Sequence, residues 1–168
     1  MRKFMFIDAE TDGLYGPFLS IAAITCDEKG NEESIFYARR KLMAEEIQEE
    51  WVKEHVVPYL NASIVFETEL ELLQAFWEYY RSYKDCVCIG DVIYPVEIRI
   101  FEQNVMQNLE ERKFQAPYPF LDLSSMLYAK QIDPNIERSK LVDTSNFMAH
   151  NALDDVRISI AIWKKYII

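Results

Sequence analysis

A short apolar run that ends in two acids restricts the fold of this chain more than any other feature. Phe4–Ile7 is continuously apolar, which predicts a strand buried on both faces. Asp8 and Glu10 follow two residues apart, so a continuing strand places both side chains on one face. Such carboxylates repel each other, and a bound divalent cation relieves the repulsion. A metal site is therefore one interpretation, and a solvated strand end before the turn at Thr11-Asp12-Gly13 is the other.

Hydrophobic spacing along the rest of the chain predicts an α/β domain. Strands are expected at Phe18–Cys26, Ser34–Ala38, Cys86–Ile89 and Phe120–Leu123. Helices are expected from the apolar stripes within 43–59, 70–80, 98–109 and 153–163, and residues 130–148 are expected to form a loop with a short helix. This order predicts a single domain over residues 1–168, with a mixed five-stranded sheet and helices on both faces.

Composition limits the kinds of partner that the surface can hold. The 18 Lys and Arg against 28 Asp and Glu give a net charge of −10, which argues against a broad basic groove but not against an acidic metal pocket. No signal peptide or membrane-spanning run is present, and three cysteines without CxxC spacing suggest reduced thiols. We therefore expect a cytoplasmic protein without a membrane partner.

Two further groups of residues carry candidate chemistry. His150 precedes the last predicted helix and Asp155 lies in its first turns, where a helix-capping sequence is the alternative interpretation. Asp91 and Glu97 lie between a predicted strand and the next helix, and either one offers another oxygen ligand. Their ordinary interpretations are a turn residue and a helix N-terminal acid. The other histidine, His55, lies on an apolar stripe and is expected in the core.

Two motifs together resemble those of a known family. Phe6–Leu14 closely resembles the first motif of the DEDDh-type 3′–5′ exonucleases, which include proofreading exonucleases, ribonuclease T and oligoribonuclease. The sequence from His150 to Asp155, with Ala152 between them, is similar to the third motif of that family. The motifs lie near opposite ends of the chain in the family's order. The resemblance implies a ribonuclease H-like fold.

The resemblance also implies the roles of individual residues. Asp8, Glu10 and Asp155 match metal-binding carboxylates, and His150 matches the general base. The remaining carboxylate stays open, because Glu97 fits the helix register whereas Asp91 fits the residue type. The cofactor implied is a pair of Mg²⁺ (or Mn²⁺) ions. By the same resemblance Thr11, Gly13 and Leu14 contact the terminal nucleotide.

The implied activity is metal-dependent 3′–5′ exonuclease action on single-stranded ends or short oligonucleotides of RNA or DNA. The products are nucleoside 5′-monophosphates. Many relatives that act on short substrates are dimers, so a homodimer is one expectation. The alternative function is an inactive ribonuclease H-like module that binds a protein or nucleic-acid partner, because the second motif of this chain departs from the family pattern.

Overall fold

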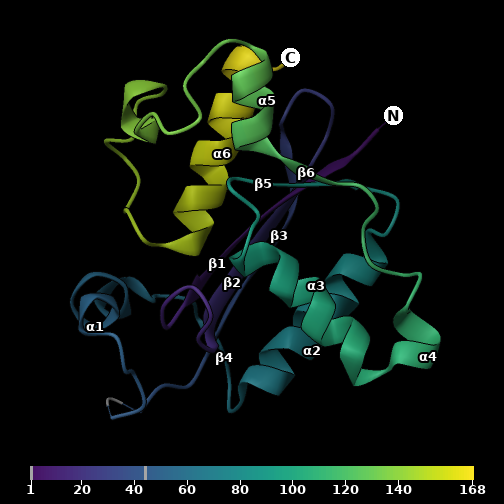
Figure 1. Cartoon of the computed structure of the whole chain (residues 1–168), viewed down its shortest axis with the longest axis vertical. Coiled ribbons are helices and arrows are strands. Elements are labelled where there is room, and N and C mark those ends of the chain that lie inside the picture. The colour runs from purple at the N-terminus through teal and green to yellow at the C-terminus, as the bar shows by residue number, and fades with distance from the viewer. Residues whose placement is uncertain (1, 44) are drawn as a thin grey trace.

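A mixed sheet with helices on both faces organises the chain in the computed structural model, which describes residues 2–43 and 45–168 (Figure 1). The strands are β1 (Phe4–Thr11), β2 (Phe18–Cys26), β3 (Glu32–Arg40), β4 (Ile64–Phe66), β5 (Val87–Gly90) and β6 (Phe120–Asp122). The helices are α1 (Glu50–His55), α2 (Glu69–Ser82), α3 (Val96–Gln107), α4 (Leu109–Arg112), α5 (Leu123–Ala129) and α6 (Ala152–Tyr166), with 3₁₀ turns at Val57–Tyr59 and Arg138–Lys140.

The sheet combines an antiparallel meander with parallel additions at both sides. Its strand order is β4-β3-β2-β1-β5-β6, where β1, β2 and β3 are antiparallel and the other three strands each pair in parallel. The expected fold class is therefore confirmed, but the sheet has six strands and not five. The additional strand β4 has only three residues, of which Ile64 and Val65 are exposed. A strand that is so short and so little buried does not produce the apolar pattern by which strands are predicted.

The alternation of side chains along β1 divides the core into two layers. Met5, Ile7 and Ala9 pack in the cluster that includes α2 and α3. Phe6 packs in the opposite cluster, which includes α6, and its ring lies 5.5 Å from that of Trp163. Because side chains alternate along a strand, Asp8 and Glu10 share the face of Phe6 and thus face α6.

The predicted helices differ from the observed ones at two places. The apolar stripe at 43–59 yields only the six-residue α1 and a 3₁₀ turn that contains Pro58, and Ala44 of this stretch lies outside the described residues. His55 is exposed, so its assignment to the core was wrong. Helix α5 was not predicted, and its N-cap is Asp122, whose side chain accepts a hydrogen bond from the Ser125 N–H at 2.6 Å. No helix among the described residues is long and apolar enough to span a membrane.

Candidate metal centre

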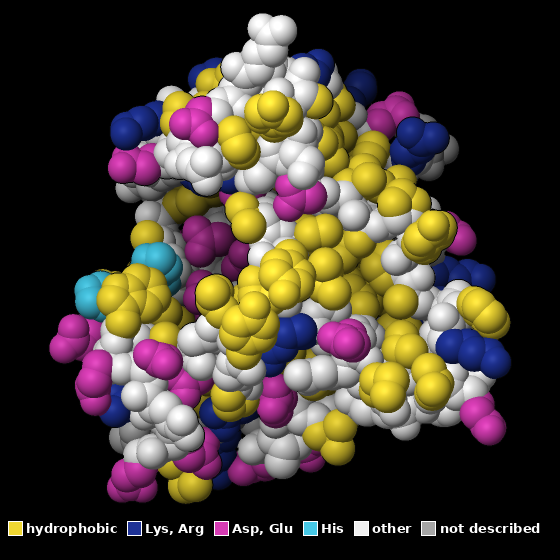
Figure 2. Space-filling view, viewed as in Figure 1, with side chains coloured by type: hydrophobic (Ala, Val, Ile, Leu, Met, Phe, Trp, Pro, Cys, Tyr) yellow, Lys and Arg dark blue, Asp and Glu magenta, His cyan; other side chains and the backbone are white. Residues whose placement is uncertain are grey.

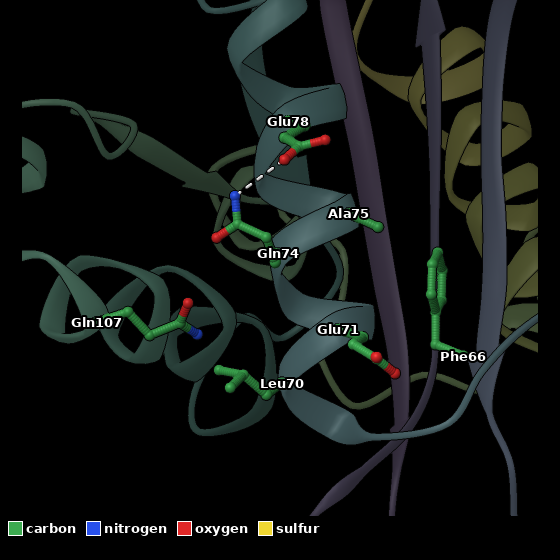
Figure 3. A pocket seen from close by; sticks show the side chains of 7 residues that line it. All are labelled: Phe66, Leu70, Glu71, Gln74, Ala75, Glu78 and Gln107. Carbon is green, nitrogen blue, oxygen red and sulfur yellow. Dashed lines mark hydrogen bonds between the residues drawn. The ribbon is translucent and has the colours of Figure 1, made fainter.

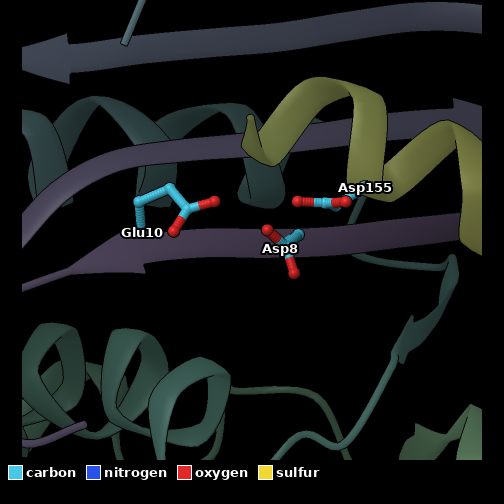
Figure 4. Close-up of side chains that lie close together, drawn as sticks. All are labelled: Asp8, Glu10 and Asp155. Carbon is cyan, nitrogen blue, oxygen red and sulfur yellow. The ribbon is translucent and has the colours of Figure 1, made fainter. Parts of the chain in front are cut away.

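Three carboxylates from the two ends of the chain converge where β1 passes the start of α6. One oxygen each of Asp8, Glu10 and Asp155 lies within 4.8 Å of the others, and all three side chains are partly buried. Figure 4 shows Asp8 and Glu10 on β1, with Asp155 approaching them from the first turns of α6. The structure thus brings together three of the residues that the sequence singled out as metal ligands.

The start of α6 is fixed by a buried asparagine. The Asn151 side chain caps the helix by accepting from the Asp154 N–H at 3.3 Å. Its amide nitrogen lies 2.8–2.9 Å from oxygens of Tyr37, Tyr59 and Asn61. Because Asn151 is only 2% exposed, these bonds are shielded from water and tie the helix to β3 and to the chain after α1. This network holds Asp155 in position opposite β1.

The electrostatics of the cluster favour a bound cation. Burial, and then the charge of Asp155, raises the pKa of Glu10 to about 7. Burial also raises the pKa of Asp155 to about 7, with further contributions from the neighbouring acids. The pKa of Asp8 lies well above its usual value because of burial and then the charge of Glu97. Burial is thus the main cause of the raised pKa values, and repulsion between the acids adds to it.

Glu97 reaches the same cluster from α3. It is 5% exposed, and burial followed by the charges of Asp91 and Glu10 raises its pKa to about 8. Its carboxylate also accepts a backbone hydrogen bond from Ala9. Strand β5 pairs with β1 only from Phe4 to Phe6. Beyond Phe6, where β5 no longer pairs with β1, Glu97 lies next to β1. The side chain thus connects α3 to the strand that bears Asp8 and Glu10.

Asp91 is engaged by a cation of the protein itself. Its carboxylate pairs with the Arg138 guanidinium through Nε and, at 2.8 Å, through Nη2. The Ser124 hydroxyl donates to the same carboxylate at 2.9 Å. Arg138 also donates to the carbonyls of Pro134 and Ile136, so it anchors the loop before α6. Of the two carboxylates left open by the sequence, Glu97 therefore has the freer oxygens.

His150 lies at the edge of the cluster, in the loop immediately before α6. It is exposed, and its backbone is left-handed, with φ of 59°. Its ring meets the edge of Trp51 at a centroid distance of 4.9 Å, and Trp51 in turn stacks on His55 at 5.0 Å. The backbone of His150 also hydrogen-bonds to Asp155, which opposes the rise in the pKa of that carboxyl. The histidine is thus held at the cluster by its backbone and by α1.

The turn after β1 presents the other residues that the sequence singled out. Thr11 is buried, Gly13 has φ of 73°, and Leu14 is 62% exposed. Asp12 accepts hydrogen bonds from the backbone N–H groups of Gln48 and Glu49 at 2.8 and 3.0 Å. These hydrogen bonds attach the turn to the segment that precedes α1. The backbone that carries the exposed Leu14 side chain is therefore held in place.

The carboxylates open to solvent through a hollow. Figure 2 shows acidic side chains recessed in the middle of one face, with histidine at the margin of the hollow and hydrophobic side chains beside it. A different cavity of about 510 Å³ lies along α2, and its Gln74 and Glu78 are hydrogen-bonded to each other at 3.1 Å (Figure 3). It is lined by Phe66, Leu70, Glu71, Gln74, Ala75, Glu78 and Gln107, which do not include any residue of the carboxylate cluster.

The fold and the cluster together define a ribonuclease H-like domain with a convergent carboxylate site. Comparison with solved structures finds the same fold in exonuclease I. The moderately thermophilic exonuclease I from Methylocaldum szegediense superposes with a TM-score of 0.68 at 18% identity, over 98% of this chain and 40% of that chain. Exonuclease I from E. coli in complex with a dA16 oligonucleotide gives a TM-score of 0.64 at 18% identity, over 98% and 40%.

The zinc-bound E. coli exonuclease I complex with single-stranded DNA gives a TM-score of 0.65 at 17% identity, over 98% and 40%. No family model and no curated protein matches the chain. At these identities the likeness establishes the fold, and the chain spans about 40% of the length of these exonucleases.

Three contributors to the site have a role that local sequence spacing does not predict. Arg138 lies in a polar segment, Trp51 lies within the apolar stripe at 43–59, and Asn151 precedes the last helix. Each acts through tertiary contacts with residues distant in the chain, namely Asp91, His150 and Tyr37. A pattern of local spacing does not encode such contacts.

Proposed function

We propose that this protein is a metal-dependent 3′–5′ exonuclease that hydrolyses single-stranded ends or short oligonucleotides to nucleoside 5′-monophosphates. The observation that carries the proposal is the approach of Asp8, Glu10 and Asp155 within 4.8 Å, beside the buried carboxylate of Glu97. The exonuclease fold of the structural neighbours supports the same class of reaction. Neighbours of this fold were solved with single-stranded oligonucleotides, which agrees with the proposed substrate.

The donor set fits hard divalent cations such as Mg²⁺ or Mn²⁺. Carboxylate oxygens are the preferred ligands of these ions. Burial, and then the charges of neighbouring acids, raises the pKa values of Glu10 and Asp155, and a bound cation would offset both effects. Asp8, Glu10, Asp155 and Glu97 would hold two ions, with Asp91 retained by Arg138. When bound, such ions activate a water and stabilise the leaving oxygen of a phosphodiester.

The chain itself supplies proton transfer and positioning. His150 would accept a proton from the attacking water at its imidazole, and Trp51 restrains that ring from one side. Thr11, Gly13 and Leu14 would contact the terminal nucleotide, with exposed Leu14 able to pack against the last base. The acidic surface, with a net charge of −10, favours short or single-stranded substrates that need few phosphate contacts.

Digestion of a 5′-labelled oligonucleotide tests this function. With Mg²⁺ or Mn²⁺ we expect stepwise shortening from the 3′ end and release of 5′-mononucleotides, whereas EDTA stops the reaction. A circular single strand of the same composition is the matched control, because an exonuclease requires an end. Cleavage of the circle would assign an endonuclease, and no cleavage of either RNA or DNA would favour the inactive binding module.

The variant His150→Ala separates the proton acceptor from the metal ligands. We expect its turnover to fall by a factor of about 10²–10⁴, the usual contribution of a general base, while Mg²⁺ binding by calorimetry persists. The matched control is His55→Ala, which removes the other histidine of the same aromatic stack. A fully active His150→Ala enzyme would exclude this residue as the base.

A further inference from the structure

Exposed aromatic side chains gather between α4 and β6, away from the carboxylate cluster. Tyr118 is 100% exposed and Phe114 is 89% exposed, although large apolar rings are usually covered in a folded protein. Two cavities adjoin them, one of about 240 Å³ against α3 and one of about 430 Å³ toward the start of β5. The cavities share Ala116 and Pro117 in their walls, so they are neighbours on the surface.

Basic side chains surround these rings, in contrast to the acidic balance of the whole chain. Arg81 and Lys84 line the larger cavity together with Phe114 and Tyr118, and Asp85 is the only acid in that lining. Lys113 places its Nζ 5.5 Å from the centre of the Phe114 ring. In a protein of net charge −10, this local excess of cations creates a region that attracts phosphate.

We propose that this aromatic–basic surface, formed by Arg81, Lys84, Lys113, Phe114 and Tyr118, binds single-stranded nucleic acid several nucleotides away from the end that is hydrolysed. Aromatic rings that stack bases, combined with cations that follow the phosphates, are the usual elements of sequence-tolerant single-strand binding. The assignment of the hydrolysed end rests on the proposed exonuclease function, whereas binding to the surface does not.

The distance between the aromatic–basic surface and the carboxylate cluster fits a single nucleic-acid strand that contacts both. Phe120 pairs with Cys88, which pairs with Met5, so the strand spacings place Tyr118 about 20 Å from Asp8. About six stacked nucleotides cover that distance at about 3.4 Å each. The intervening path is apolar, because Ile98, next to Glu97 in α3, lines the smaller cavity. Figure 2 shows hydrophobic side chains reaching from the hollow across this face to the side of the molecule.

Binding can be measured without hydrolysis. Fluorescence anisotropy in EDTA follows labelled oligomers of about ten uridines or thymidines, and we expect each of Tyr118→Ala and Phe114→Ala to raise Kd about fivefold or more. Lys84→Glu should weaken binding and reduce its salt dependence. The matched controls are Tyr128→Ala and Lys130→Glu, at exposed positions on and just after α5, where we expect Kd to stay within about twofold of the wild type.

Hydrolysis supplies a second, separable measurement. If the wild type is active, the ratio of kcat/KM for the oligomer of about ten nucleotides to that for a dinucleotide should fall toward one in Tyr118→Ala. An unchanged Kd in Tyr118→Ala, Phe114→Ala and Lys84→Glu would overturn the proposal. It would also be overturned if sedimentation showed that Tyr118→Ala loses a dimer of the wild type while oligomer binding stays intact, because the surface would then be a dimer interface. An inactive wild type that still binds oligomers through Tyr118 would refute the exonuclease function and leave the surface supported.

Discussion

The metal-free protein should become less stable as the pH rises from about 5 to 8. Asp155 has an ordinary pKa of 3.8 in an unfolded chain and a pKa of about 7 in the folded protein, because it is buried among other acids. Between these values the folded protein holds more protons than the unfolded chain, so the free energy of unfolding falls with rising pH. From pH 5 upward about two of these pKa units remain, which corresponds to about 3 kcal/mol for this group as an upper limit, since water reaches the half-buried carboxylate.

Chemical unfolding in EDTA at pH 5 and pH 8 measures this loss. Mg²⁺ at about 100 times its Kd should restore about 2.7 kcal/mol at pH 8 by binding only the folded protein. The variant Asp155→Asn is the control, because it lacks the titrating charge. It should exceed the wild type by at most about 1.6 kcal/mol at pH 5, where the unfolded wild type is already ionised, exceed it by more at pH 8 in EDTA, and gain less from Mg²⁺. A wild type that is as stable at pH 8 as at pH 5, with Asp155→Asn behaving identically, would refute the reasoning.

Three other perturbations follow from the site. Glu97→Gln removes a buried charge without changing shape, and calorimetry should show Mg²⁺ affinity reduced tenfold or more, whereas Asp91→Asn should change it less than about threefold. Arg138→Met leaves Asp91 without its cation, and thermal unfolding should show a loss of about 2 kcal/mol, since an unpaired and partly buried charge remains. Asn151→Ala removes the α6 cap and three shielded bonds, and denaturant unfolding should show a loss of about 2 kcal/mol. Unchanged stability in either of the last two variants would contradict the assigned contacts.

The sequence anticipated those parts of the fold that depend on local pattern. The run at Phe4–Ile7 is continuously apolar and the apolar stripe of α6 is long and regular, so the sequence places both elements, and the carboxylates within them, where the structure has them. The three residues of β4 are too few to form such a pattern. This strand is defined by its pairing with β3, which the sequence does not show. Likewise α1 is shorter than the apolar spacing predicts, because Asp12 binds the backbone just before its start and a 3₁₀ turn that contains Pro58 follows its end.

The choice between Asp91 and Glu97 as a metal ligand depends on contacts that the sequence does not show. Both are acids between a strand and a helix, and sequence position gives each a reason to be a ligand. The distinction arises from Arg138, which is 47 residues from Asp91 in the chain and neutralises it. Glu97 instead bonds to the backbone of Ala9 beside the cluster. Only the tertiary arrangement reveals which carboxylate is already engaged.

Anomalous diffraction from crystals soaked in Mn²⁺ tests the central claim most directly, because it counts and places the ions. The account predicts two peaks among Asp8, Glu10, Glu97 and Asp155, with the Asp91–Arg138 pair intact. The variant Asp8→Asn, prepared in the same way, should lose or weaken both peaks. No peak in the wild type at saturating Mn²⁺, or a peak held by Asp91 in place of Glu97, would contradict the proposed metal centre.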